Sequence, residues 1–336
     1  MTTTTPVPAE TDPGAPRRSA GRVALTIVSK YGTLFAMAIL IVIFSFASPD
    51  FSFLQPSNLL NIVNQSTLTA IIAAGLTVVL VVGEFDLSIG YHASFAVVLV
   101  SGLIANQHLP VPVAIIVTIA AGAVIGLANA LLVTKAHVNA VVATLAVGTI
   151  TVGLTFGYSS GTPVIALPAD FTNIALSSFL GIPNPIWFMV IVLGVLWAVL
   201  NRTPFGQGIQ ATGANRHASR LAGIRTDRAK IGAFIIAGLC AAITGVLLAS
   251  LLGSGTASSA DGYLLNAFAA VFLGAATLRE GEFHIVGTLV GVLIVNIGFN
   301  GLSQLGTPTF FQYIFQGAIL AAAVALSTIA RRASRA

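Results

Sequence analysis

Residues 111–133 read VPVAIIVTIAAGAVIGLANALLV, a run of 23 residues with no charged side chain. About 20 mostly apolar residues, each rising 1.5 Å, are enough for a helix to cross the hydrocarbon core of a bilayer. The whole chain is 56% hydrophobic and only 7% charged, with a mean hydropathy of +0.95. Its 336 residues carry more apolar surface than one soluble core can bury. The sequence therefore predicts an all-α fold, a polytopic bundle of transmembrane helices.

Nine further apolar runs bring the expected number of membrane-crossing helices to about ten. The ten runs lie near residues 31–47, 66–82, 88–105, 111–133, 138–157, 186–200, 231–252, 264–278, 285–300 and 310–329. The shorter runs could instead be broken or re-entrant segments, which membranes tolerate where other protein surrounds them.

Pairs of glycines spaced four residues apart predict places where helices pack closely, because a glycine lets two backbones approach. The pairs are Gly122 and Gly126, Gly153 and Gly157, and Gly287 and Gly291.

The basic residues indicate the orientation of the predicted bundle, because cytoplasmic loops collect Lys and Arg while exported loops do not. When the chain is threaded through ten crossings from an internal N-terminus, all 15 Lys and Arg residues fall on the cytoplasmic side. The exported loops hold only the acidic residues Asp50, Asp170 and Asp261. We therefore expect cytoplasmic N and C termini in a multi-pass protein of the inner (plasma) membrane. The net charge of +5 serves topology here and does not indicate a nucleic-acid partner.

Composition divides the chain into three parts. Residues 1–30 begin with a Thr/Pro/Ala-rich stretch and end in a basic collar, which is typical of a disordered cytoplasmic tail. Residues 31–330 form the expected transmembrane domain, with a basic cytoplasmic loop at 201–230, and residues 331–336 form a basic C-terminal tail. A cleavable signal peptide is the alternative for the first apolar run, but no clear small-x-small cleavage site follows it.

Two carboxylates interrupt the apolar sequence in residues 82–90, VGEFDLSIG. No basic residue is close in sequence, so Glu84 and Asp86 need solvent or a partner. If the segment is a cytoplasmic turn, we expect Asp86 to cap the next helix through its first-turn amides. If the segment dips inward, it marks a transport pathway or a buried partner. The capping turn is the favoured interpretation.

Uncharged amide and hydroxyl side chains form a second polar set in or near the later runs. Neutral amides can donate and accept hydrogen bonds to a hydroxylated solute without demanding an ion, although bonding between helices is their default role. Asn296 and Asn300 share one helical face at i and i+4. We take Thr144, Asn296 and Asn300 as candidates for lining a translocation pathway. The full set is Asn129, Asn139, Thr144, Asn266, Asn296, Asn300, Gln304, Gln312 and Gln316.

Residues 211–224, ATGANRHASRLAGI, are the most specific stretch, a cytoplasmic segment predicted to hold a short helix ended by Gly223. Three small or apolar side chains form a stripe on this helix, and two arginines lie one turn apart on another side. The stripe is Ala214, Ala218 and Leu221, and the arginines are Arg216 and Arg220. Such a helix can lie on the membrane surface or dock into a groove on a partner.

Several motifs in order resemble those of the inner-membrane permeases of sugar-type ATP-binding-cassette (ABC) importers. This family comprises the ribose, xylose, arabinose and galactose group and also includes autoinducer permeases. The similarity runs from about Asn58 to Leu326. It rests on residues 83–90 (GEFDLSIG), 142–145 (VATL) with 153–154 (GL), 213–224, and 287–291 (GTLVG) with 300–302 (NGL).

The resemblance implies a permease subunit that translocates a sugar or similar small polyhydroxylated solute into the cytoplasm by alternating access. It implies cytosolic ATPase subunits that bind ATP and Mg²⁺, an extracytoplasmic solute-binding protein, and a second permease chain, expected to be an identical copy. It also places Glu84, Asp86 and Ser88 in the family's motif turn. Coupling to the ATPase falls to Gly213, Asn215, Arg216, Ala218, Arg220, Leu221 and Gly223.

The chain itself lacks the sequence features of an ATPase or another enzyme. None of Lys30, Lys135 and Lys230 follows a phosphate-binding Gly-rich loop, and the five His residues are dispersed without metal-ligand spacing. An ion-coupled secondary carrier for a small polar solute is the alternative, and it would need carboxylates in the translocation path. Glu84 and Asp86 are the candidates for that role, and they are predicted in a loop. We therefore expect a transport subunit without catalytic, cofactor or metal residues of its own.

Overall fold

The computed structural model of the chain describes residues 20–275 and 281–335. Its elements are α1 (Ala20–Ala47), η1 (Pro49–Leu54), α2 (Pro56–Val81), α3 (Ile89–Ala105), α4 (Val111–Thr134), α5 (Ala140–Ser159), α6 (Ala169–Leu176), β1 (Ser178–Phe179), β2 (Ile182–Pro183), α7 (Asn184–Arg202), α8 (Pro204–Ala214), α9 (Arg216–Leu221), α10 (Thr226–Leu252), α11 (Tyr263–Ala275), α12 (Ile285–Gln304) and α13 (Phe310–Arg335). Each of the ten predicted apolar runs overlaps one helix. One short antiparallel hairpin, β1 with β2, departs from the all-helical expectation.

Among the described residues, six helices are long and apolar enough to cross a membrane: α2, α4, α5, α7, α10 and α12. Shorter apolar stretches of 10–17 residues lie in α1, α3, α11 and α13. The architecture therefore fits an all-α polytopic membrane protein, while the number of ten crossings stays a prediction.

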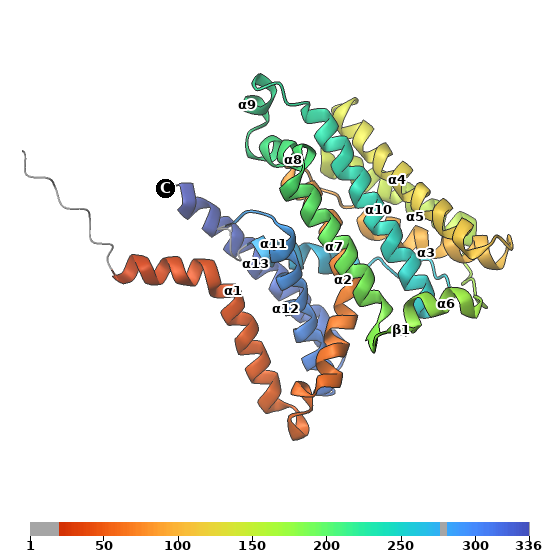
Figure 1. The fold of residues 1–336 in the computed structure, drawn as a ribbon, viewed down its shortest axis with the longest axis horizontal. Coiled ribbons are helices and arrows are strands. Elements are labelled where there is room, and N and C mark those ends of the chain that lie inside the picture. The colour runs from red at the N-terminus through yellow and green to blue at the C-terminus, as the bar shows by residue number, and fades with distance from the viewer. Residues whose placement is uncertain (1–19, 276–280, 336) are drawn as a thin grey trace, which may run out of the picture.

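Helices α2 and α10 occupy the middle of the bundle, with α3, α4 and α5 on one side and α11, α12 and α13 on the other (Figure 1). Every residue of α2 from Ser66 to Leu80 is buried. A helix that is apolar all round belongs in such an interior position. By contrast, α4 exposes Ile116 and Val124 on its outer face, an apolar surface of the kind that hydrocarbon covers.

Glycine spacing predicts the contact between α4 and α10 correctly. A Cβ added at Gly122 or Gly126 would overlap backbone atoms of α10, for example the carbonyl oxygen of Phe234. The third predicted pair, on α12, packs in the same way against α11. Gly153 and Gly157 differ, because an added Cβ would have no heavy atom within 4 Å at either position. The prediction of close packing at this pair is therefore wrong for the described part of the chain, because both glycines lie on the exposed face of α5.

The link between α10 and α11 descends into the bundle along α3. A Cβ added at Gly255 would lie 2.6 Å from Cβ of Ser101, near the end of α3. Asp261 follows Gly255 by six residues, and its Oδ1 accepts the hydroxyl of Ser94, in the first half of α3, at 2.6 Å. Asp261, expected in an exported loop, is therefore packed beside α3, and α11 begins at Tyr263 after this descent. Residues 253–262 therefore run along α3 instead of extending away from the bundle.

The chain ends differ from the predicted tails. Residues 1–19 of the expected disordered tail lie outside the described residues, but residues 20–30 belong to α1. Ala, Leu, Ile and Val are frequent in that stretch, so the first apolar helix extends through it. The predicted basic tail at 331–336 likewise continues α13 as far as Arg335. The transmembrane domain boundaries expected at 31 and 330 therefore do not coincide with helix ends.

Candidate functional site

The predicted cytoplasmic loop 201–230 holds α8 and α9, which lie together at one end of the bundle (Figure 1). Thr203 caps α8, because its hydroxyl accepts the N–H of Gly206 at 3.1 Å. Asn215 caps α9, because its side-chain oxygen accepts the N–H of Ala218 at 3.0 Å. Caps of this kind satisfy amides that a helix start leaves free. Both short helices therefore have defined beginnings.

Helix α9 presents an apolar side chain to solvent. Leu221 is 79% exposed, and Ala218 one turn before it is also exposed. Arg216 and Arg220 both approach the carboxylate of Asp227, with N–O distances of 3.7 and 3.5 Å. Half-exposed ion pairs such as these contribute little to stability. An exposed leucine on a capped helix at the end of the bundle is suited to a protein partner.

The start of α9 differs from the prediction and its end agrees with it. Gly223 has a φ of +80°, a left-handed conformation that ends helices, and its N–H donates back into α9 at 3.0 Å. Ala214, predicted in the apolar stripe, ends α8 instead. Asn215 separates the two helices because its backbone is extended, with φ −156° and ψ 101°. The apolar stripe on α9 therefore consists of Ala218 and Leu221.

The end of α8 touches the end of α2 directly, at a contact that we call the α2–α8 joint. A Cβ added at Gly213 would overlap the carbonyl oxygen of Val81. Gly83, which turns the chain after α2 with a φ of +89°, lies close on the same side, because its own added Cβ would be 3.6 Å from Cα of Gly213. No side chain separates the two backbones. Close-packed contacts transmit displacement, so a movement of α8 reaches α2.

An ion pair lies beside the α2–α8 joint. Lys230 Nζ, near the start of α10, donates to Glu84 Oε1. The Lys230 and Glu84 side chains are only 4% and 17% exposed. Glu84 has no basic neighbour nearby in sequence, because Lys230 lies 146 residues away in the chain. One sequence signal could have suggested this pairing: Glu84 and Lys230 both flank apolar runs on the same predicted side of the membrane.

Asp86 lies inside the bundle, and its interpretation as a cap of α3 is wrong. It is fully buried, and its Oδ1 accepts both the N–H of Ser88, at 2.8 Å, and the Ser88 hydroxyl. Ser88 precedes α3, so the first-turn amides of α3 receive no bond from Asp86. Asn129 of α4 donates to the Ser88 hydroxyl at 2.8 Å, and the Leu87 N–H donates to the Thr144 hydroxyl at 3.1 Å. The motif turn therefore dips inward and joins α4 and α5.

The three candidate pathway residues are buried and hydrogen-bonded within the chain. Thr144 bonds its own helix besides Leu87, and Asn296 donates to the carbonyl of Val292 at 3.0 Å. Asn300 and Asn58 exchange two amide bonds of 3.1 Å each, which tie α12 to the start of α2. None of the three lines the cavity between α2, α7 and α10. A role in lining the pathway stays a prediction for them.

A polytopic bundle of apolar helices with a capped, exposed segment at one end is the architecture of an integral membrane protein, and a membrane permease fits it. Residues 58–324 match the family model described as "Branched-chain amino acid transport system / permease component", and the chain belongs to this permease family.

The chain is 39% identical to the ribose import permease protein RbsC of Bacillus subtilis (strain 168), over 89% of this chain and 93% of that relative. It is 36% identical to RbsC of Escherichia coli (strain K12), over 87% and 91%. It is 35% identical to the L-arabinose ABC transporter permease protein AraH of Azospirillum brasilense, over 96% and 94%. No solved structure matches the chain.

These comparisons confirm the resemblance to sugar-type ABC importer permeases that the sequence motifs indicated. The chain is a transport subunit rather than an enzyme, and it is a multi-pass protein of the inner membrane.

Proposed function

We propose that this chain moves a sugar, or a similar small polyhydroxylated solute, into the cytoplasm by alternating access driven by partner ATPase subunits. The observation that carries the proposal is the exposed Leu221 on α9. The neighbouring helix α8 contacts the central helix α2 backbone to backbone, at Gly213. A partner that grips α9 can displace α8, and the α2–α8 joint passes that displacement to the middle of the bundle. ATP and Mg²⁺ are bound by the ATPase and not by this chain.

The cargo is inferred from the relatives and from the polar side chains inside the bundle. Relatives that cover most of the chain are named for ribose, L-arabinose and D-allose. These molecules are neutral and rich in hydroxyl groups, and amides and hydroxyls can bind them without an ion.

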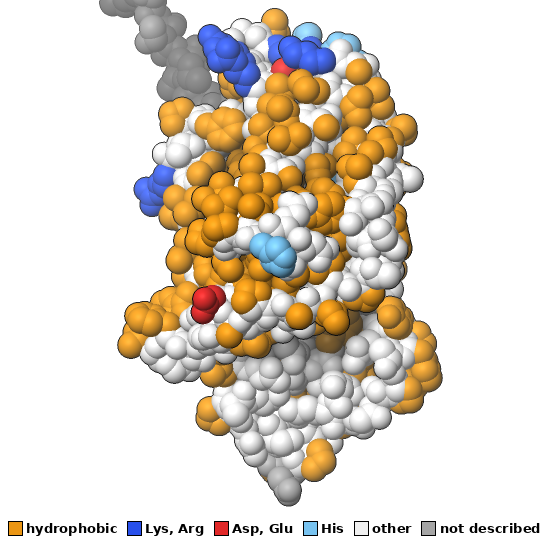
Figure 2. Space-filling view, turned by 90° about the vertical axis from the view of Figure 1, so that its right-hand side faces the viewer, with side chains coloured by type: hydrophobic (Ala, Val, Ile, Leu, Met, Phe, Trp, Pro, Cys, Tyr) orange, Lys and Arg blue, Asp and Glu red, His pale blue; other side chains and the backbone are white. Residues whose placement is uncertain are grey.

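The orientation follows from charge. On the face shown in Figure 2, Lys and Arg side chains lie toward the end that carries α9, above a broad band of hydrophobic side chains. Basic residues mark the cytoplasmic side, so α9 faces the cytosolic ATPase, both termini are cytoplasmic and the chain crosses the membrane ten times. A solute-binding protein delivers the cargo at the opposite end, and a second copy of the chain completes the permease.

The experiment reconstitutes the chain with its ATPase and solute-binding protein in liposomes and measures ATP-dependent uptake of D-ribose, L-arabinose and D-allose. Leu221→Asp places a charge where an apolar contact is expected, so uptake is lost while the protein remains folded. Gln207→Asp, on an exposed position of α8, is the matched control and retains uptake. Unchanged uptake in Leu221→Asp would overturn the docking role. Uptake driven by a proton or sodium gradient without the ATPase would favour a secondary carrier instead.

A further inference from the structure

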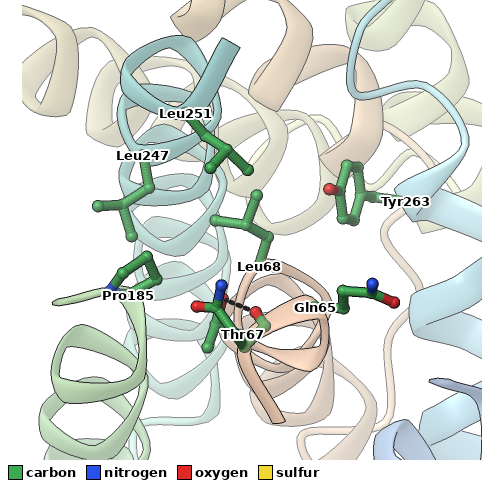
Figure 3. Close-up of a pocket in the computed structure, with 8 residues that line it drawn as sticks. Gln65, Thr67, Leu68, Pro185, Leu247, Leu251 and Tyr263 are labelled. Carbon is green, nitrogen blue, oxygen red and sulfur yellow. Dashed lines mark hydrogen bonds between the residues drawn. The ribbon is translucent and has the colours of Figure 1, made fainter. Parts of the chain in front are cut away.

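A cavity of about 250 Å³ lies between α2, α7, α10 and the start of α11 (Figure 3). Helices α7 and α10 contribute to it near Pro185 and Leu251, whereas their other ends connect to α8 and α9. The cavity therefore lies toward the opposite end of the bundle from the docking segment. With α9 in the cytoplasm, it lies in the extracytoplasmic half of the permease.

The cavity has a polar wall that comes from α2. Asn64 Oδ1 is buried and has no hydrogen-bond partner among the described residues. The Thr67 hydroxyl donates to the backbone carbonyl of Asn64 at 2.7 Å, so the lone pairs of the Thr67 oxygen stay free to accept a hydrogen bond. The Gln65 amide nitrogen donates to Asn61 at 3.3 Å, which leaves its carbonyl oxygen available. Buried amide oxygens are normally bonded, so this side chain is not held in place by the rest of the described protein, and a rotation of Asn64 would bring its oxygen to a donor in the cavity.

The opposite wall is aromatic and apolar. Tyr263 lies across the cavity from Gln65 and Leu68 in Figure 3, and it directly follows residues 253–262, which run along α3. Leu247 and Leu251 of α10 complete this wall. Tyr offers an apolar ring and a polar hydroxyl together. The combination of amides, hydroxyls and apolar surface, with no charged residue in the lining, suits a neutral molecule that carries hydroxyl groups on an apolar ring.

The cavity is closed toward the cytoplasmic end of α2 and α10. A Cβ added at Gly75 would lie only 2.7 Å from Cβ of Cys240, so these two helices are in tight contact there. A cavity of about 250 Å³ has room for several water molecules or for one small polar molecule.

We propose that this cavity is a binding site for one monosaccharide in the extracytoplasmic half of the permease, with Asn64, Gln65, Thr67 and Tyr263 as its polar contacts. The assignment rests on the proposed function, since it takes the imported solute as the occupant. It names a site that shares no residue with the buried polar residues Thr144, Asn296 and Asn300.

The first test measures the melting temperature of the purified chain in lipid nanodiscs with D-ribose, L-arabinose or D-allose. A bound ligand stabilises the folded state, so at least one sugar raises the Tm of the wild-type chain. Asn64→Leu loses most of that rise because it removes the unpaired amide. Asn173→Leu, at an exposed position of α6, keeps it and corrects for the general stabilising effect of concentrated sugar. Equal rises in the two variants would overturn the site.

The second test locates the sugar. In a Cys240→Ala background, Gln65→Cys introduces a thiol at the cavity edge, and a membrane-impermeant thiosulfonate reagent modifies it from outside. The sugar that raises the Tm slows this modification several-fold and leaves modification of Asn173→Cys unchanged. Equal rates at Gln65→Cys with and without sugar would overturn the location. If the complete importer accumulates a sugar that gives no protection here, this site fails and the proposed function stands. If none of the three sugars is accumulated, the proposed function fails as well.

Discussion

The two ends of helix α2 differ in how they are packed. At the end that meets α8, the backbone touches Gly213 without an intervening side chain, and the Glu84–Lys230 ion pair lies beside this contact. Toward the other end the same helix borders a cavity, and the Asn64 oxygen has no hydrogen-bond partner among the described residues. One end is therefore built as a rigid joint, and the other retains space and unused hydrogen-bonding capacity.

This difference fits the separate tasks that an importer assigns to the two sides of a membrane. A joint transmits displacement only if it is close-packed, because a soft contact would absorb the movement. A transient solute site needs polar groups that are not already committed within the protein. Substitutions at the α2–α8 joint should therefore cost much more stability than substitutions at the cavity.

The largest effect is expected for Gly213→Ala at the α2–α8 joint. The new methyl group would overlap the Val81 carbonyl, and forcing it in costs about 3 kcal/mol or more because neither backbone can move aside. Uptake is lost, and the thermal stability of the purified chain falls. Gly208→Ala on the same helix is the control, because its added Cβ meets only Ile224, at 3.7 Å, an ordinary contact. Similar stability for the two variants would show that the joint is soft.

Much of the fold could be predicted from the sequence, because hydrophobic runs and charge bias are local signals. Each of the ten apolar runs overlaps a helix, and the glycines at 122 and 126 mark the α4–α10 contact. The descent of residues 253–262 could not be predicted, because it depends on a hydrogen bond between Ser94 and Asp261, 167 residues apart. Helix breaks set by one residue, such as Asn215, were likewise missed.

The candidate site was predictable only where its residues are neighbours in the chain. Residues 211–224 could be predicted from local composition to hold a short helix ended by Gly223, and Gly223 does end α9. The docking role of this segment stays a prediction. The partner of Glu84 and the buried position of Asp86 depend on how α4, α5 and α10 meet, which no short motif encodes. The cavity was missed because Asn64 and Tyr263 are ordinary residues until the fold brings their helices together.

Lys230→Met should also lower the stability of the chain strongly, although less than Gly213→Ala does. Removing the lysine leaves the largely buried Glu84 carboxylate without its partner, and breaking a buried ion pair costs about 3 kcal/mol or somewhat less where one side retains some water. Adding Glu84→Gln to Lys230→Met should restore most of the loss, because no unpaired charge then remains. Thermal denaturation of the single and double variants gives the coupling energy. A double variant as unstable as Lys230→Met would show that the pair does not act as a unit.

Ser88→Ala should have an intermediate effect. It removes the hydroxyl that donates to Asp86 and accepts from Asn129, and unpaired buried polar groups cost about 1–3 kcal/mol. Thr149→Val is the control, since Thr149 is exposed and bonds only its own helix, to Leu145 at 2.9 Å. The apparent free energies of unfolding in detergent should differ clearly. If Ser88→Ala matches the control, the motif turn contributes little to the rigidity of the end of the bundle that carries the α2–α8 joint.

The smallest change in the stability of the unliganded chain is expected for Asn64→Leu. Unlike the other three variants, it should not lower that stability. The Asn64 oxygen has no hydrogen-bond partner in the described part of the chain, so replacing the amide by an apolar group of similar size removes a desolvation cost instead of a bond. Stability without sugar should stay equal or rise by about 1 kcal/mol at most. Melting curves of the sugar-free chain beside those of Ser88→Ala provide the comparison. A clear loss of stability would mean that Asn64 holds the structure together, and the contrast between the two ends of α2 would disappear.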